Sequence, residues 1–215
     1  MPDVPKRIAV LGASGAIGRR IVDRLLARGF DVVCQTRSSE KLSQFEGRVT
    51  LQVFNPRDAS KLPAFIHGAD VVIYALGVHS TGATTFFSDT TAALIGAMRQ
   101  ANVRRLIAIT GVGAGETKGH GGFLYNWFFY PLFTHRIYAD KDRQERLIET
   151  SGLDWIIVRP GPFFDRKKRV PLEVLTEIRP ETQLAWISRD EVADFVVAQV
   201  GSNTYLRQKP FIGHV

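Results

Sequence analysis

The sequence predicts a doubly wound α/β fold, in which helices cover both faces of a parallel sheet. Short, unbroken apolar runs recur along the chain, as expected of parallel strands that are buried on both faces. Segments with apolar residues at helical spacing lie between these runs, without a linker, a repeat or a low-complexity segment. A glycine-rich turn follows the first run. These three observations predict a Rossmann fold in a single domain over residues 1–215.

The first predicted unit is a strand, a glycine turn, a helix and a second strand. Residues 8–11 form an apolar run after two basic residues. Apolar residues then recur at helical spacing from Ile17 to Leu26, and Gly29 is placed to end that helix. Residues 30–35 resume the strand pattern, which completes a βαβ unit.

Three glycines spaced three apart, Gly12, Gly15 and Gly18, occupy the turn of this unit. In such a turn the first glycine permits a sharp bend, the second lets backbone approach a pyrophosphate, and the third lets helix and strand pack closely. Amide groups at the helix start and the helix dipole favour the phosphate charge. The alternative is a tight turn that binds nothing. We expect a dinucleotide here, contacted also by Ser14, Ala16 and Ile17.

The remaining elements continue the alternation. Further strands are expected over residues 49–54, 69–77, 104–111 and 153–161. Helices are expected over residues 84–101, 137–150 and 192–200, the last preceded by a capping box from Ser188 to Glu191. Because ligands of doubly wound folds bind at the carboxyl ends of the strands, the site residues should follow the strands directly.

Composition narrows the class of protein. With 45% hydrophobic residues, the chain can bury a sizeable core. Its single cysteine, Cys34, excludes an internal disulfide and is expected to be a small buried hydrophobe. We expect a cytoplasmic protein without a membrane span, because no apolar stretch approaches about 20 residues and the N-terminus lacks a signal-sequence pattern.

Charge suggests an anionic ligand. The formal net charge is +7, but the basic residues are scattered, apart from a run at residues 166–169 that is typical of a solvated loop. We therefore expect no nucleic acid partner and no metal site. A positive field favours an anionic cofactor or substrate.

Several motifs together resemble one family. The segments "GASGAIG", "TRSSEKL", "ALG", "ITG", "YADKDRQE" and "SGLDWIIVRPGPF" are similar to the atypical short-chain dehydrogenase/reductases. Within them the chain resembles the single-domain NAD(P)H-binding group that includes biliverdin-IXβ (flavin) reductase and NmrA-like proteins. The likeness covers nearly the whole chain and implies fold and cofactor. That group contains reductases, isomerases and non-catalytic redox sensors, so the reaction is implied less strongly.

The residues after the second, third and fourth strands indicate the cofactor. A carboxylate after the second strand would bind an NAD ribose, whereas this chain has Arg37, which suits the 2′-phosphate of NADP. The resemblance implies an adenine-binding aspartate after the third strand, where this chain has Asn55. After the fourth strand, Ala75, Leu76 and Gly77 resemble a segment that passes along the cofactor, with tight packing as the alternative. NADPH is the expected cofactor.

The catalytic prediction rests on the resemblance. Many relatives carry a tyrosine four residues before a helical lysine, and the tyrosine donates the proton. Lys141 matches that lysine, but the position four residues earlier is Ile137. Tyr138 lies three before Lys141, so its direction differs by about 100° of helical rotation. Thr110 matches a hydroxyl residue that orients the substrate. His120 and His135 are alternative proton donors.

The expected acceptor is small, flat and conjugated. An aromatic segment at residues 119–138 is predicted to cover the nicotinamide end, with core packing, a dimer interface and membrane-surface contact as alternatives. A substrate-binding region would comprise residues 112–136 and 161–187. Its rim would be Pro160, Gly161, Pro162 and Phe163. We expect an NADPH-dependent reductase of a flavin, quinone, bilin or enone, as a monomer or homodimer. The alternative is a non-catalytic NADP(H) sensor of NmrA-like type.

Overall fold

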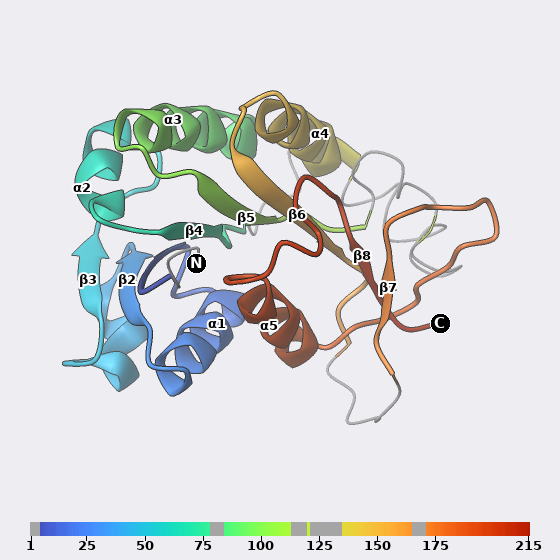
Figure 1. Ribbon diagram of the computed structural model, residues 1–215, viewed down its shortest axis with the longest axis horizontal. Helices are drawn as coiled ribbons and strands as arrows, with labels where there is room; N and C mark the ends of the chain where they lie inside the picture. Colours follow the sequence, from blue (N-terminus) through green and yellow to red (C-terminus); the bar gives the residue numbers. More distant parts are fainter. Residues whose placement is uncertain (1–4, 78–83, 113–119, 121–134, 165–170) are drawn as a thin grey trace.

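The structure is a computed structural model that describes residues 5–77, 84–112, 120, 135–164 and 171–215. Within these residues, eight strands form one sheet in the order β3-β2-β1-β4-β5-β6-β8-β7 (Figure 1). Every pair of neighbouring strands is parallel except β7 and β8. The first six positions have the strand order of a Rossmann fold, so the predicted doubly wound α/β fold is confirmed.

The elements follow one another as strand and helix along most of the chain. The strands are β1 (Arg7–Leu11), β2 (Asp31–Thr36), β3 (Thr50–Val53), β4 (Val71–Tyr74), β5 (Arg105–Ile109), β6 (Asp154–Pro160), β7 (Glu173–Leu175) and β8 (Phe211–Gly213). The α-helices are α1 (Ala16–Ala27), α2 (Leu62–Ile66), α3 (Phe86–Gln100), α4 (His135–Glu149) and α5 (Arg189–Ala198), and the 3₁₀ helices are η1 (Ser39–Phe45) and η2 (Ala59–Lys61).

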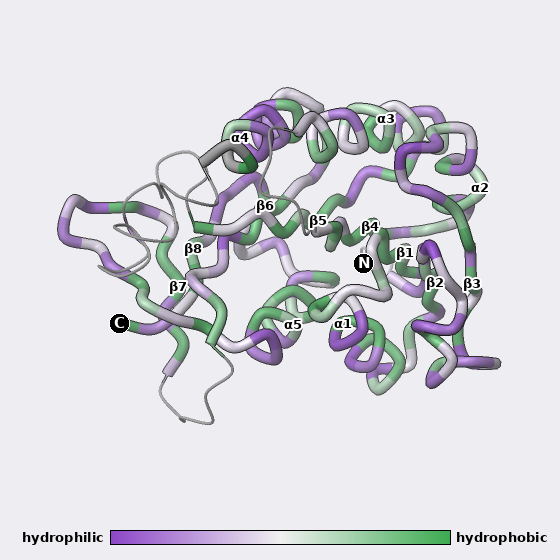
Figure 2. Tube along the Cα trace, turned by 180° about the vertical axis from the view of Figure 1, so that it is seen from behind, coloured by the Kyte–Doolittle hydropathy of each residue, from purple (hydrophilic) through white to green (hydrophobic). Residues whose placement is uncertain are grey.

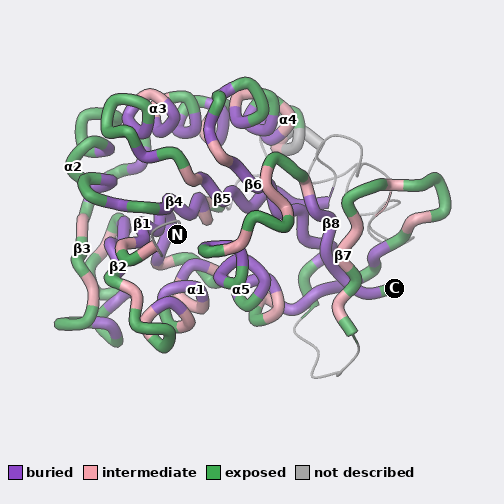
Figure 3. Tube along the Cα trace, viewed as in Figure 1, coloured by how far each residue is buried: buried purple, intermediate pink, exposed green. Residues whose placement is uncertain are grey.

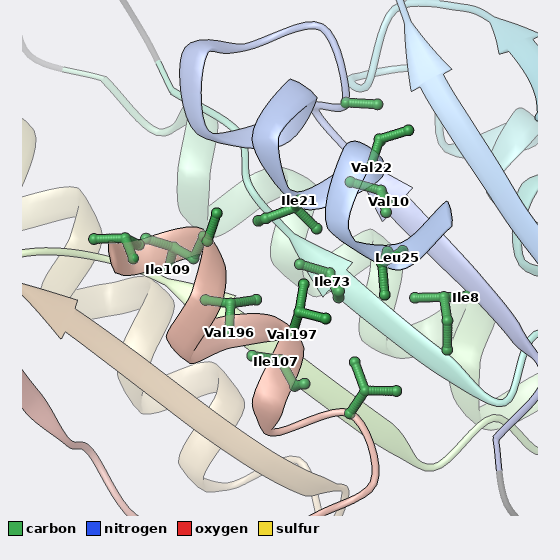
Figure 4. Packing of buried hydrophobic residues seen from close by; sticks show 14 of the residues in the cluster. Ile8, Val10, Ile21, Val22, Leu25, Ile73, Ile107, Ile109, Val196 and Val197 are labelled. Atoms are coloured by element: carbon green, nitrogen blue, oxygen red, sulfur yellow. The ribbon is translucent and has the colours of Figure 1, made fainter. Parts of the chain in front are cut away.

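The central strands are mostly apolar because helices cover both faces of the sheet. In β1, Ile8 and Val10 belong to a core cluster with α1 and α5, whereas Ala9 and Leu11 belong to a second cluster with α2, α3 and α4. Figure 4 shows the first cluster from close by, and Figure 1 shows the two helical layers on opposite sides of the sheet. Hydrophobic residues accordingly gather along the central strands (Figure 2), which are buried (Figure 3).

The predicted elements are all present, with ends that shift by a few residues. The predicted strand at residues 69–77 is shorter in the structure, because β4 ends at Tyr74 and the chain then leaves the sheet. Gly29 follows α1 with φ +79°, as expected of a helix-ending glycine. The capping box is confirmed, since the Ser188 hydroxyl accepts from the Glu191 amide and the Glu191 carboxylate accepts from the Ser188 amide.

Cys34 lies in β2 and is fully buried, as expected. Burial raises the pKa of its thiol to about 12. The cysteine is therefore a packing residue and stays protonated at neutral pH. Among the helices that the structure describes, none has the length and apolar character needed to cross a membrane.

Candidate functional site

The glycine turn after β1 is held close to the end of β4. Gly12 has φ +89°, and a Cβ atom there would lie 2.7 Å from the Ala75 carbonyl oxygen. A Cβ at Gly18 would lie 2.9 Å from the Cα atom of Ala13. The first and third glycines therefore permit the bend and the close packing that their spacing predicts. Gly15, the N-cap of α1, donates its amide to the Gly12 carbonyl at 3.1 Å.

A buried glutamine fixes this turn against the neighbouring strands. The Gln35 side chain accepts from the Gly12 amide at 3.0 Å and donates to the Phe54 carbonyl at 2.7 Å. Sequence reasoning missed Gln35, although a polar residue inside the apolar strand β2 was a usable signal. Through this amide, β2 and the end of β3 hold the glycine turn in place.

A cleft of about 510 Å³ opens beside the glycine turn, at the carboxyl ends of β1 to β4. Eight of its lining residues were predicted from the sequence as cofactor contacts: Gly12, Ser14, Gly15, Arg37, Asn55, Ala75, Leu76 and Gly77. The other six are Gln35, Lys41, Pro56, Arg57, Thr84 and Phe86. The predicted Ala16, Ile17 and Gly18 form the first turn of α1 beside it. Three cations line the cleft, and none of its described lining residues carries a carboxylate.

One of these cations, Arg57, is held in place by two contacts. Its guanidinium carbon lies 5.2 Å from the centre of the Phe86 ring, and its Nη1 atom lies 3.5 Å from the Asp89 carboxylate. Arg57 follows β3, where the resemblance gave only Asn55 as a contact. An aromatic ring and a guanidinium face one another at this end of the cleft.

Lys141 lies on α4 and is 9% exposed. Its ammonium donates to the Thr110 carbonyl oxygen at 2.5 Å and lies 4.7 Å from the centre of the Phe87 ring. Burial lowers the pKa of Lys141 to about 8, against the opposing effect of the Glu145 and Asp140 charges. The lysine is therefore mostly charged at neutral pH and loses its proton under mildly alkaline conditions.

The Thr110 hydroxyl is committed to a partner inside the protein. It donates to the Glu145 carboxylate at 2.7 Å, and Thr110 is itself buried just after β5. Glu145 also binds Arg159 of β6 through two hydrogen bonds, of 2.5 and 3.2 Å. Because the Thr110 hydroxyl gives its proton to Glu145, it could only accept a hydrogen bond from a substrate.

Asp140, next to Lys141, joins α4 to the start of α3. Its carboxylate accepts from the Phe87 amide at 2.8 Å, the Ser88 amide at 3.3 Å and the Ser88 hydroxyl at 2.5 Å. It is fully buried and also binds Arg143. These contacts satisfy amide groups of the first turn of α3, which fixes α4 relative to α3.

The predicted rim at the end of β6 is anchored by backbone. The Gly161 amide donates to the Ile212 carbonyl and the Ile187 amide donates to the Pro162 carbonyl, both at 2.9 Å, while Pro160 ends β6. Phe163 is 38% exposed, and the Arg189 guanidinium carbon lies 5.2 Å from the centre of its ring. An exposed aromatic ring therefore stands at the rim position.

Several predicted residues lie outside the described part of the chain. These are most of the aromatic segment, at positions 121–134, together with residues 113–119 and 165–170 and the side chains of Tyr138 and His135. Ile137, four positions before Lys141, packs against the second core cluster. His120 is described, and its Nδ1 atom lies 2.7 Å from the Thr182 carbonyl oxygen. No metal-binding group of three or more His, Cys, Asp or Glu occurs in the described ranges.

A glycine turn, a helix start and a basic cleft at the carboxyl ends of parallel strands define a dinucleotide-binding Rossmann protein. The chain matches the NAD(P)H-binding family over residues 12–203, and it belongs to that family. The resemblance found in the sequence is thereby confirmed.

Relatives and solved structures agree with this assignment. An uncharacterized chloroplastic protein of Arabidopsis thaliana is 32% identical over 210 residues, which cover 89% of this chain and 71% of that protein. An uncharacterized sugar epimerase of Bacillus subtilis, YhfK, is 26% identical over 203 residues, which cover 90% of this chain and 87% of that protein.

Two solved structures share the fold at 20% identity each. A short-chain dehydrogenase/reductase of Veillonella parvula in complex with NADP has a TM-score of 0.76, covering 98% of this chain and 95% of that chain. ChuY of Escherichia coli O157:H7, described as an anaerobilin reductase, has a TM-score of 0.75, covering 97% of each chain. These likenesses show that the chain shares the fold of both proteins.

Proposed function

We propose that this chain is an NADPH-dependent reductase that transfers hydride to a small, flat, conjugated acceptor such as a flavin, quinone, bilin or enone. The observation that carries the proposal is the cleft beside the glycine turn, which Arg37, Lys41 and Arg57 line and to which no described lining residue contributes a carboxylate. Such a lining suits the 2′-phosphate of NADP and offers no acidic partner for an NAD ribose.

The residues present fit this cofactor. The start of α1, with Gly15 as its N-cap, would hold the pyrophosphate, because free amides and the helix dipole face it. Arg37 would bind the 2′-phosphate, and the Lys141 ammonium would donate to the nicotinamide ribose. When bound, the reduced cofactor supplies the hydride. The protein positions the acceptor and excludes water, and Tyr138 or solvent supplies the proton.

The acceptor class is supported by the exposed ring of Phe163 at the rim and by the fold shared with an anaerobilin reductase. It is tested by following NADPH oxidation at 340 nm with riboflavin, menadione, biliverdin and a simple enone. Turnover of at least one of them with NADPH, and its loss in Lys141→Ala, is the expected result. NADPH binding without turnover of any acceptor would contradict the reductase proposal.

A second candidate function is an NADP(H)-binding redox sensor without chemistry. It is favoured by Ile137, which packs against the core at the position where many relatives carry the catalytic tyrosine. A sensor should bind NADP and NADPH with different affinities while turning over no acceptor. Calorimetry with both forms of the cofactor, combined with the acceptor assay, separates the two functions.

Replacing Arg37 with alanine should remove the preference for NADPH. A charge-assisted hydrogen bond contributes about 1.5–3 kcal/mol, so NADPH affinity should fall about 10- to 150-fold while NADH affinity changes little. Calorimetry with both cofactors measures this. The matched control is Arg48→Ala, which removes the same charge from an exposed residue that does not line the cleft. Equal affinity of the wild type for NADPH and NADH would exclude the predicted role.

A further inference from the structure

A buried ion pair lies beside the predicted catalytic lysine. Glu145 is 2% exposed and Arg159 is 1% exposed, and the two form a paired, two-bond contact between α4 and β6. A buried ion pair is expensive to desolvate, and well-packed hydrophobic residues often stabilise a protein as well or better. Stability alone therefore explains this pair poorly.

The pair is connected to Lys141 through a single residue. Thr110 donates its hydroxyl to Glu145 at 2.7 Å and accepts the Lys141 ammonium on its backbone carbonyl at 2.5 Å. Glu145 and Lys141 are four positions apart on α4 and thus share one helix face. Glu145 therefore holds Thr110 through its hydroxyl, and this contact fixes the position of the carbonyl oxygen that the Lys141 ammonium binds.

The charges around Lys141 come from two elements. On α4 itself, Asp140 and Glu145 favour the ammonium, and Arg143 is bound to Asp140. On β6, Arg159 neutralises Glu145. The ammonium is therefore favoured by two carboxylates of its own helix, and one of them, Glu145, is also paired with Arg159.

The other described groups facing the ammonium are uncharged or already paired. From α3 it meets the Phe87 ring, and from the end of β5 it meets the Thr110 carbonyl. The acid in the first turn of α3, Asp89, is exposed and paired with Arg57. Among the described groups, Glu145 and Asp140 are therefore the charges that favour the ammonium, and Glu145 is the one that also binds Thr110.

We propose that Glu145, held by Arg159, is the positioning residue that keeps Lys141 charged and anchored on the Thr110 carbonyl. This inference rests on the proposed function, because the charged lysine matters for the reaction only if it binds the cofactor. Glu145 contacts neither cofactor nor substrate in this scheme. It acts through Thr110 and through its charge.

Two single variants should shift the titration of Lys141 in opposite directions. Glu145→Gln removes a carboxylate that favours the ammonium and therefore lowers the pKa of Lys141. Arg159→Gln leaves Glu145 as an uncompensated anion and raises that pKa. The double variant Glu145→Gln, Arg159→Gln removes both charges and should titrate between the two single variants. Each single shift should be about one pH unit or more.

The measurement is the pH titration of the Lys141 ¹³Cε resonance in protein labelled with [ε-¹³C]lysine, assigned with Lys141→Met. It needs neither cofactor nor turnover. A purely structural role would move both single variants in the same direction or not at all, and either result would overturn the proposal. If one single variant does not fold, the sign of the shift in the other decides. If neither folds, the pair is structural and the proposal fails.

Cofactor binding then separates this inference from the proposed function. The pH at which NADPH affinity falls should follow the Lys141 midpoint in each variant. Opposite shifts of Lys141 with an unchanged pH dependence of NADPH affinity would keep Glu145 as the residue that positions Lys141, but would remove Lys141 from the cofactor site.

Discussion

Replacing Gly12 with alanine should abolish NADPH binding and lower the free energy of unfolding by about 2–5 kcal/mol. The new Cβ would lie 2.7 Å from the Ala75 carbonyl oxygen, and the backbone has φ +89°. The left-handed conformation costs about 1–2 kcal/mol for a non-glycine residue, and overpacking adds about 1–3 kcal/mol. The atoms that the Cβ would meet belong to backbone, so the turn itself must move. Urea unfolding and NADPH calorimetry measure the two effects.

Two other glycines separate the causes. Gly29 has φ +79°, but no atom lies within 4 Å of the position that a Cβ would take, so Gly29→Ala should cost about 1–2 kcal/mol and leave NADPH binding intact. Gly96 lies inside α3 with open space around it, so Gly96→Ala should gain about 0.5–1 kcal/mol. A Gly12→Ala variant that unfolds no more easily than Gly29→Ala would contradict the close approach to Ala75.

Replacing Lys141 with methionine should make the protein more stable and much less active. Burial lowers the pKa of Lys141 from 10.5 to about 8, so holding its charge opposes folding by up to about 3 kcal/mol at pH 7. Methionine fills a similar volume without the charge, and the free energy of unfolding should rise by about 1–3 kcal/mol. Loss of the ammonium should lower kcat/KM about 100-fold or more.

The sign of the pH dependence gives an independent check. Between pH 8 and 10.5 the unfolded chain binds more protons at Lys141 than the folded chain does. The contribution of Lys141 to the free energy of unfolding of the wild type therefore rises with pH in this range. The stability advantage of Lys141→Met should therefore be full below about pH 8 and disappear above about pH 10.5. Urea unfolding at about pH 7 and about pH 10 measures the difference.

Tyr138→Phe is the matched variant on the same helix. It should keep more activity than Lys141→Met, because Lys141 matches the family position and Tyr138 does not. Hydride transfer is followed as NADPH oxidation, beside NADPH binding. A Tyr138→Phe variant with normal NADPH binding and no detectable hydride transfer would reverse this order and make tyrosine the proton donor.

Most residues that line the cleft beside the glycine turn could be predicted because their signals are local. The glycine turn, the residue after β2 and the small residues after β4 each directly follow a strand, so the parallel sheet alone brings them to one edge. Gln35 and Arg57 were missed, since their roles depend on contacts with the Phe54 carbonyl and the Phe86 ring. Those contacts join different βα units, and no pattern in one unit reveals them.

The region around Lys141 was harder to predict. Glu145 and Arg159 are separated by the end of α4 and most of β6, and only the folded chain pairs them. A lone arginine in the apolar strand β6 was a usable signal for a buried acidic partner. Strands β7 and β8 were missed because each has only three residues, too few for a periodic pattern.

Asp140 binds amides at the start of α3 although it belongs to α4, 53 residues away from Phe87 along the chain. The two helices should therefore open together, since undocking α4 exposes uncapped amides on α3. In hydrogen exchange, the amides of Phe87 and Ser88 should show the same protection as the middle of α4. Local unfolding around Lys141 would then extend to the start of α3, where Phe86 lines the ligand cleft.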